Sequence, residues 1–139
     1  MATPLPTEVK LHKASAKLEL VYGEQESFQL SAEFLRVHSP SAEVRGHGRG
    51  QEVLQTGKRQ VSIKGIEAVG NYALKFEFDD GHNSGIYSWP YLYELATQQQ
   101  SLWQLYLSKL KAAGASRDAL PADTQVITIL PSPDDSNKS

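Results

Sequence analysis

The chain of 139 residues contains no cysteine. Without cysteine the protein can form neither disulfides nor thiolate metal sites. It also cannot use a cysteine nucleophile, or hold an iron–sulfur cluster with its own thiolates. A chain without cysteine fits a reducing compartment, so we expect a cytoplasmic protein.

Long hydrophobic runs are also missing. No apolar stretch approaches the roughly 20 residues that span a bilayer, and the start, MATPLPTEVK, lacks the basic residues and apolar run of a signal peptide. The net charge is only −2, so the chain as a whole is not attracted to nucleic acid or to anionic lipid. We therefore expect a soluble protein that binds neither nucleic acid nor membrane.

Short catalytic motifs are the third absence. The chain contains no GxSxG nucleophile elbow, no GxxxxGK[ST] phosphate loop, no GxGxxG dinucleotide fingerprint and no HxD iron-binding pair. A Ser/His/Asp set cannot be placed from spacing alone. We expect no catalytic residue and no cofactor, and an enzyme is the least favoured class.

What the sequence does contain is a set of five stretches in which apolar and polar residues alternate. This period of two is typical of half-buried strands. The stretches are Glu8–Lys13, Lys17–Tyr22, Ser27–Leu30, Val61–Ala68 and Tyr72–Phe78. In the last stretch, Tyr72 is expected on the same face as Phe76 and Phe78. Short links such as Gly70-Asn71 favour antiparallel hairpins.

Helical segments follow from capping residues and from apolar spacing. Ser31 can cap one helical turn, and Pro90 can open a short helix. Apolar residues three and four apart predict a longer helix over Gln99–Ala113, with Gly114 as its C-cap. The predicted fold class is α+β, a small β-rich domain of antiparallel hairpins with a short helix and a C-terminal helix.

This predicted domain covers residues 7–114. Residues 115–139 are rich in Pro, Asp and Ser, a composition that predicts a disordered tail. One apolar patch, Val126–Leu130, interrupts the tail and could attach to the domain or to a partner.

The stretch from His38 to Gln60 contains four Gly, few large apolar residues and no clear period, which predicts a long loop. Long loops are often functional. From Arg36 to Lys64 the chain carries six Lys or Arg against two Glu, a local basic zone. Backbone N–H groups of the Gly-rich part, beside Arg45 and Arg49, could hold an anion. A solvated loop is the simpler alternative.

Three of the four histidines, His38, His47 and His82, are expected in or beside loops, whereas His12 is expected to face solvent. Three imidazoles from two loops could form an open metal site. Neither HxH nor HxxxH spacing supports this, so three surface imidazoles are the alternative. Exposed aromatic residues, Trp89 among them, could add a binding patch.

Two stretches together resemble a known family: Leu35–Gly48, LRVHSPSAEVRGHG, and Leu74–Leu95, LKFEFDDGHNSGIYSWPYLYEL. An LR-x-x-S-P-S-A loop, a strand, a D-G-H turn and a short aromatic helix follow one another, as in the gamma-butyrobetaine hydroxylase-like N-terminal domain of unknown function. The resemblance spans about Val9 to Leu95 and implies a small β-rich α+β fold. Similar domains occur alone in bacteria, in front of the oxygenase domain of carnitine-pathway hydroxylases, and fused to ATP-binding iron–sulfur carrier proteins.

In those hydroxylases, the resemblance implies a structural zinc held by three Cys and one His. The Cys positions would fall on Ser39, Ser41 and Val44 of this chain, and the His on His82. Thiolates supply most of the binding in such a site, so we expect the fold without the metal, with His82 a weak metal candidate. The resemblance covers no oxygenase domain, so hydroxylase activity is not implied.

Two functions from different classes stay open. The first is a non-catalytic binding or adaptor module with a protein partner, for which the family's fusions suggest an iron–sulfur carrier. The second is a small metal- or anion-binding protein that uses loop 38–50 and His82. The candidate binding residues are His38, Ser39, Ser41, Arg45, His47, Arg49, His82 and Trp89.

Overall fold

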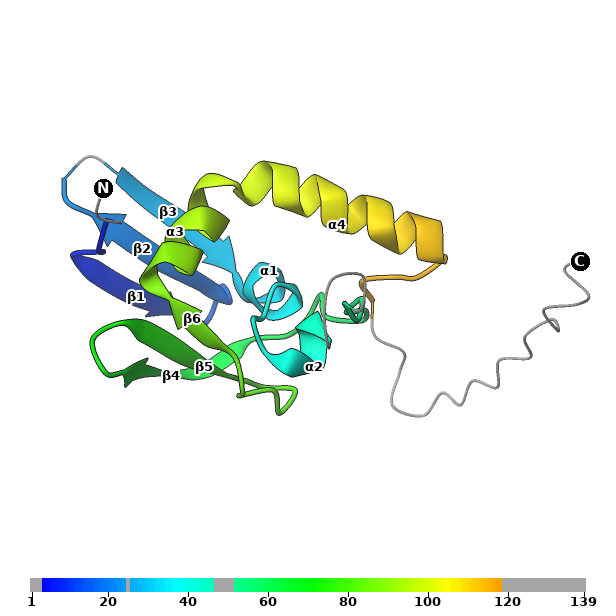
Figure 1. Cartoon of the computed structure of the whole chain (residues 1–139), viewed down its shortest axis with the longest axis horizontal. Coiled ribbons are helices and arrows are strands. Elements are labelled where there is room, and N and C mark those ends of the chain that lie inside the picture. Colours follow the sequence, from blue (N-terminus) through cyan, green and yellow to red (C-terminus); the bar gives the residue numbers. More distant parts are fainter. Residues whose placement is uncertain (1–3, 25, 47–51, 119–139) are drawn as a thin grey trace, which may run out of the picture.

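The computed structural model describes residues 4–24, 26–46 and 52–118 (Figure 1). Its strands are β1 (Glu8–His12), β2 (Lys17–Tyr22), β3 (Glu26–Ser31), β4 (Ile63–Val69), β5 (Ala73–Phe78) and β6 (Ile86–Ser88). Its helices are α1 (Ala32–Val37), α2 (Ala42–Arg45), α3 (Trp89–Thr97) and α4 (Gln99–Ala113). The strands form two antiparallel three-stranded sheets, β1-β2-β3 and β4-β5-β6. The α+β fold class predicted from the sequence is confirmed.

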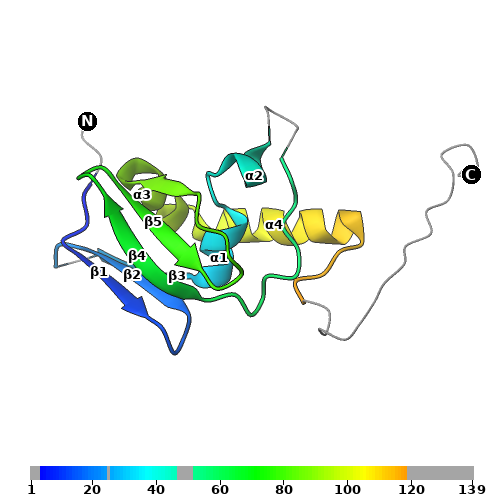
Figure 2. The same cartoon turned by 90° about the horizontal axis from the view of Figure 1, so that it is seen from below.

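The two sheets lie at one end of the molecule, and α4 extends from them toward the other end (Figure 2). In the first sheet Leu18 lies opposite Leu30, and Leu20 lies opposite Phe28. Every second residue of β2 is buried, as the alternating sequence predicted. Within the described residues, no helix is long and apolar enough to cross a membrane.

The second sheet corrects one prediction. Tyr72 is 58% exposed and precedes β5, so it does not share the buried face of Phe76 and Phe78. The reason is the turn before the strand: Gly70 has φ +54°, and the Tyr72 amide donates to the Val69 carbonyl at 3.3 Å. The chain is still turning at Tyr72.

Side-chain caps begin α1 and α3, and the first of these is the cap that the sequence predicted. Ser31 accepts from the Phe34 amide at 3.0 Å and begins α1. Ser88 accepts from the Tyr91 amide at 3.3 Å and begins α3. Helix α4 covers the predicted residues, and Gly114 ends it with φ +64° in the left-handed region that favours glycine.

One core joins both sheets to α1 and α3, and a smaller cluster attaches α4. The largest fully buried apolar side chains of the core are Tyr87, Phe34, Phe76, Phe78, Leu18, Leu20, Leu30, Leu35, Leu92 and Leu95. The smaller cluster is Val37, Tyr106 and Leu110. Burial of this apolar surface is the main driving force for folding.

The predicted long loop, residues 38–60, is only partly a loop. It contains the short helix α2, which begins at its cap Ser41. Pattern analysis missed it because four residues are too few to show a period.

The described residues beyond the predicted domain boundary, 115–118, lie on the domain, and we call them the C-terminal strap. The Gly57 amide donates to the Ser116 carbonyl at 2.9 Å, and the Arg59 amide to the Arg117 carbonyl at 2.9 Å. The disorder expected of residues 119–139, and the patch Val126–Leu130, lie outside the described residues.

Candidate binding site

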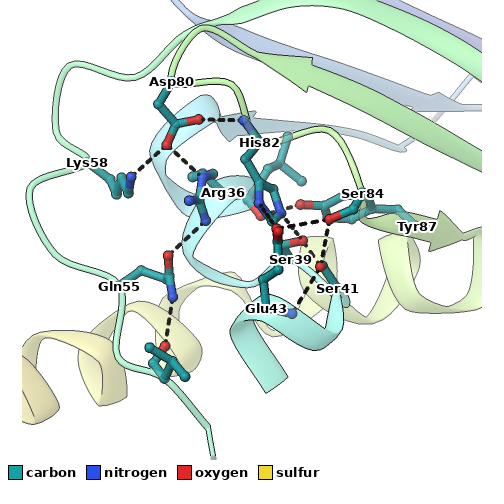
Figure 3. Close-up of polar contacts among 12 residues, drawn as sticks. Arg36, Ser39, Ser41, Glu43, Gln55, Lys58, Asp80, His82, Ser84 and Tyr87 are labelled. Atoms are coloured by element: carbon teal, nitrogen blue, oxygen red, sulfur yellow. Dashed lines mark hydrogen bonds and ion pairs between the residues drawn. The ribbon is translucent and has the colours of Figure 1, made fainter. Parts of the chain in front are cut away.

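A cluster of hydrogen-bonded side chains joins the link between α1 and α2 to the loop between β5 and β6 (Figure 3). His82 is at its centre. The His82 Nε2 lies 2.8 Å from the Ser39 Oγ, and its Nδ1 lies 2.9 Å from the Glu43 Oε1. Ser84 donates to the same Glu43 oxygen at 3.0 Å and lies 2.7 Å from the Ser41 Oγ. We call these five residues the clasp.

The protonation state of His82 follows from its surroundings. Burial lowers the pKa of His82 below its usual value, and the Arg36 charge lowers it further, although Glu43 and Asp80 act in the opposite direction. His82 is therefore neutral near pH 7. Because a carboxylate only accepts hydrogen bonds, Nδ1 carries the proton toward Glu43, and Nε2 accepts from the Ser39 hydroxyl.

A serine hydroxyl, an imidazole and a carboxylate joined by hydrogen bonds also form the catalytic triad of serine hydrolases. In that triad the imidazole is the base that activates the serine, and the carboxylate orients the imidazole. Here the hydroxyl is enclosed. Ser39 is 1% exposed, and a Cβ added at Gly85 would collide with its Oγ. A substrate carbonyl could reach this oxygen only if the surrounding chain moved. The arrangement therefore supports the joining of two loops rather than nucleophilic attack.

A second polar cluster fixes the segment that follows α2. Arg36 donates to Asp80 at 2.9 Å and to Gln55 at 2.9 Å, and the Lys58 Nζ lies 2.6 Å from Asp80. Burial alone would raise the pKa of Asp80. Hydrogen bonds from Lys58 and the His82 amide, together with Arg36, outweigh burial and lower the pKa to about 2.

Ion pairs engage four of the six cations of the predicted basic zone. Arg36 and Lys58 share Asp80, the Arg59 Nε lies 2.5 Å from the Asp118 Oδ1, and the Lys64 Nζ lies 4.0 Å from the Glu77 Oε2. Arg45 forms no ion pair among the described residues. Its guanidinium lies 4.9 Å from the centre of the Tyr91 ring, a cation–π contact.

Between these clusters and α4 lies a hollow of about 350 Å³, which we call the α4 groove. Its walls are the end of α1, α2, segment 52–55, Tyr91 and α4. Its apolar lining consists of Val37, Val44, Val53, Leu54, Leu102, Leu105 and Tyr106. The Tyr106 hydroxyl donates to the Gln55 carbonyl at 2.7 Å, so α4 is tied to the segment across the groove.

The charged and titratable side chains of the groove are His38, Arg45, Glu52 and Lys109. Burial lowers the pKa of His38, and the Lys109 charge adds to this, although the hydrogen bond to the Phe34 carbonyl acts in the opposite direction. His38 is therefore neutral near pH 7. The groove then carries two cations against one carboxylate.

The structure separates the candidate residues into three places. His38, Ser39 and Arg45 line the groove, while Ser41 and His82 belong to the clasp with Ser39. Trp89 lies apart from both and donates from its Nε1 to the Asn71 carbonyl at 3.0 Å. His47 and Arg49 lie outside the described residues, so the metal- or anion-binding alternative that depends on loop 38–50 stays a prediction.

The side chains at the implied zinc positions do not fit that metal. Both ring nitrogens of His82 are engaged, by Ser39 and Glu43, and Val44 offers no donor atom. Hydroxyls replace the thiolates that zinc prefers at the other two positions. Across the described residues, no group of three or more His, Cys, Asp or Glu is placed to hold a metal ion.

Sequence reasoning missed several residues of these clusters, namely Arg36, Glu43, Gln55, Asp80 and Ser84. Ser39 and His82 are 43 positions apart, and Arg36 and Asp80 are 44 apart. Such pairs leave no local pattern, because they depend on how the two sheets come together. The resemblance to a known family was the signal that drew attention to Ser39 and Ser41, whereas His82 was already a candidate as a loop histidine.

Fold and site together define a small α+β domain of two three-stranded sheets, with a polar clasp and a groove beside its long helix. The chain belongs to the gamma-butyrobetaine hydroxylase-like N-terminal domain family, whose model matches residues 9–93. This confirms the resemblance noted in the sequence. Among curated proteins none matches.

Seven chains of solved structures are similar to the protein, the following three among them. One NMR solution structure is 52% identical with a TM-score of 0.76, and the match covers 91% of this chain and 100% of that one. A second is 49% identical with a TM-score of 0.71, covering 91% and 95%. A crystal structure of a protein of unknown function from Acidithiobacillus ferrooxidans, of the DUF971 family, is 34% identical with a TM-score of 0.55, covering 66% and 92%.

Proposed function

We propose that this protein is a non-catalytic binding module, and that the α4 groove takes up part of a partner protein. The observation that carries the proposal is the combination of exposed apolar residues and positive charge in one hollow. Val53 is 52% exposed and Leu105 is 51% exposed, and Arg45 and Lys109 lie in the same lining. Apolar side chains supply affinity on binding, and charges select the partner.

The surroundings of the groove support this role because they hold its walls in place. The clasp fixes α2, and the bonds from Arg36 and Tyr106 to Gln55 fix segment 52–55. A binding surface that is ordered before the partner arrives loses less conformational entropy on association. In this proposal His38 and Arg45 contact the partner, whereas Ser39, Ser41 and His82 hold α2 in position.

An iron–sulfur carrier protein is the first partner to test, because domains resembling this one occur fused to such carriers. The domain would then act as an adaptor, since its described residues contain no thiolate to hold a cluster itself. A surface that is slightly cationic and apolar suits a partner segment with carboxylates beside apolar side chains.

The test is a titration of the purified carrier with the wild-type chain and with single variants. Leu105→Gln and Arg45→Glu should each weaken binding about tenfold or more, because each alters a groove contact. Leu105→Gln tests the apolar contact, and Arg45→Glu tests the positive charge. Tyr72→Gln is the matched control, since Tyr72 is equally exposed but lies at the turn before β5. Equal binding by all four proteins, or no binding by the wild type, would reject the proposal for this partner.

A further inference from the structure

The groove is open at its rim, and the chain has a segment that suits it. We propose that Val126–Leu130 of this same chain lies in the α4 groove and competes there with any partner. The inference shares the groove with the proposed function but needs no external partner. It rests on three observations: where the described chain ends, what the segment is made of, and what lines the groove.

The C-terminal strap brings the chain end close to the groove. Asp118, the last described residue, pairs with Arg59 at 2.5 Å. The groove residue Gln55 is four residues from Arg59, a span of at most about 14 Å along the backbone. The eight residues from Asp118 to Val126 can extend over about 26 Å. The segment can therefore reach the groove while the strap stays in place.

The composition of the segment matches the groove. Its sequence, VITIL, contains four large apolar side chains, and β-branched residues favour an extended chain. Residues 119–139 carry three Asp and one Lys. The groove presents apolar side chains with Arg45 and Lys109 against Glu52. Apolar contact and opposite charge therefore act together.

Two other hollows are larger than the groove but less suited to this segment. One has about 410 Å³, and its lining of Pro40, Arg45, Ile86, Ser88, Pro90, Tyr91 and Glu94 carries one cation and one carboxylate. The other has about 470 Å³, lies beside Phe34 and Trp103, and is otherwise lined by Ser31, Ala96, Thr97, Gln99 and Gln100. Those lining residues carry no charge, and most of them are neutral polar groups. An acidic apolar segment gains less there, because polar groups would lose water without a new partner.

Because a short connection joins Val126–Leu130 to the domain, weak contacts are sufficient to hold this segment in the groove. Tethering through a connection of this length gives an effective concentration in the millimolar range. A segment that binds as a free peptide with a dissociation constant of roughly 0.1 mM would then occupy the groove in roughly nine chains of ten. A partner would have to displace it, which would weaken the partner's apparent affinity about tenfold.

The test uses the full chain and the absence of native cysteine. A nitroxide attached through Ser132→Cys reports which amides lie near the segment, because paramagnetic broadening in NMR spectra falls steeply with distance. We expect broadening of the amides of Val53, Leu105 and Tyr106, and none in β1 or β4. The matched control is the same labelled chain with Ile127→Asp and Ile129→Asp, in which the groove amides should recover their intensity.

A second measurement checks reversibility. A synthetic peptide of residues 119–135, added to the full chain with Ile127→Asp and Ile129→Asp, should restore the wild-type chemical shifts of the groove amides. The inference is overturned if the label broadens no groove amide, if it broadens them equally in the control, or if the broadened amides belong to the hollow beside Phe34 and Trp103.

These outcomes are independent of the proposed function. If the carrier binds at the groove while the label and peptide give no effect there, the partner site stands and the self-docking inference fails. If the label and peptide report the groove while the carrier does not bind, the inference stands and the proposed partner fails. If both hold, Ile127→Asp with Ile129→Asp should strengthen carrier binding about tenfold.

Discussion

Gly85 is the residue on which the clasp depends most directly. A side chain at this position would meet the Ser39 Oγ, the Pro40 Cδ at 3.2 Å and the Tyr87 ring at 3.3 Å. None of these neighbours is a flexible side-chain end, because Ser39 and Tyr87 are both fully buried. The glycine is thus required for close approach of two loops, and not for an unusual backbone angle.

Gly85→Ala should therefore destabilise the fold. We expect a loss of about 1–3 kcal/mol in the free energy of unfolding, as for other overpacked sites, measured by urea denaturation. Gly65→Ala is the matched control, because nothing lies within 4 Å of a Cβ there, and it should be nearly neutral. If the two variants were equally stable, the close approach at Gly85 would not matter.

Asp80 gives a prediction about acid stability. Its pKa is about 2 in the folded protein and 3.8 ordinarily, so the unfolded chain takes up a proton at a higher pH than the folded one. The charged carboxylate therefore contributes stability above about pH 4, and this contribution is lost as pH falls from 3.8 toward 2.

The measurement compares the wild type with Asp80→Asn in urea at pH 5 and at pH 2.5. Asp80→Asn should be the less stable protein at pH 5, and the difference should shrink at pH 2.5. A difference that stayed constant over this range would show that the ion pairs with Arg36 and Lys58 do not control the titration.

At the scale of elements, the clasp joins two loops as a bound metal would, but with hydrogen bonds among hydroxyls, an imidazole and a carboxylate. We expect the purified protein to contain no stoichiometric zinc, and a chelator to leave its melting temperature unchanged, because a structural zinc would make folding depend on the metal. Elemental analysis and thermal unfolding with and without chelator are the measurements. One tightly held metal per chain, with unfolding on its removal, would contradict this view of the clasp.

How well the sequence predicted an element depended on how many residues could show a pattern. The fifteen residues of α4 cover four turns, and their spacing was unambiguous. Helix α2, with four residues, left no period. Tyr72 followed the apolar alternation but lies in a turn, since a turn residue can continue an alternation by chance. The contacts of the clasp and of Arg36 depend on packing between distant segments, and local patterns do not encode them.

At the scale of the whole molecule, the C-terminal strap connects parts of the chain that are far apart in sequence. Arg117 donates two hydrogen bonds to Glu33 in α1, at 2.8 and 2.6 Å. Its guanidinium also lies 4.9 Å from the centre of the Trp103 ring in α4. Glu33 is 5% exposed. The folded unit therefore extends to at least residue 118, a few residues past the boundary suggested by the end of the helix pattern.

Arg117→Ala should be strongly destabilising, because it leaves the Glu33 carboxylate buried without its cation. Breaking a buried pair by removing one partner costs about 3–5 kcal/mol. Because the Arg117 side chain is itself 27% exposed, we expect a loss in the free energy of unfolding near the lower end of this range. Urea denaturation at neutral pH is the measurement.

Arg59→Ala is the matched control in the same part of the molecule. Its partner Asp118 is 64% exposed, and exposed pairs contribute about 0–1 kcal/mol. Adding Glu33→Gln to Arg117→Ala should recover part of the loss, since a buried neutral amide needs no counter-charge. If Arg117→Ala and Arg59→Ala were equally mild, the strap would rest on the surface without stabilising the fold, and the tail that follows it would not be held near the groove.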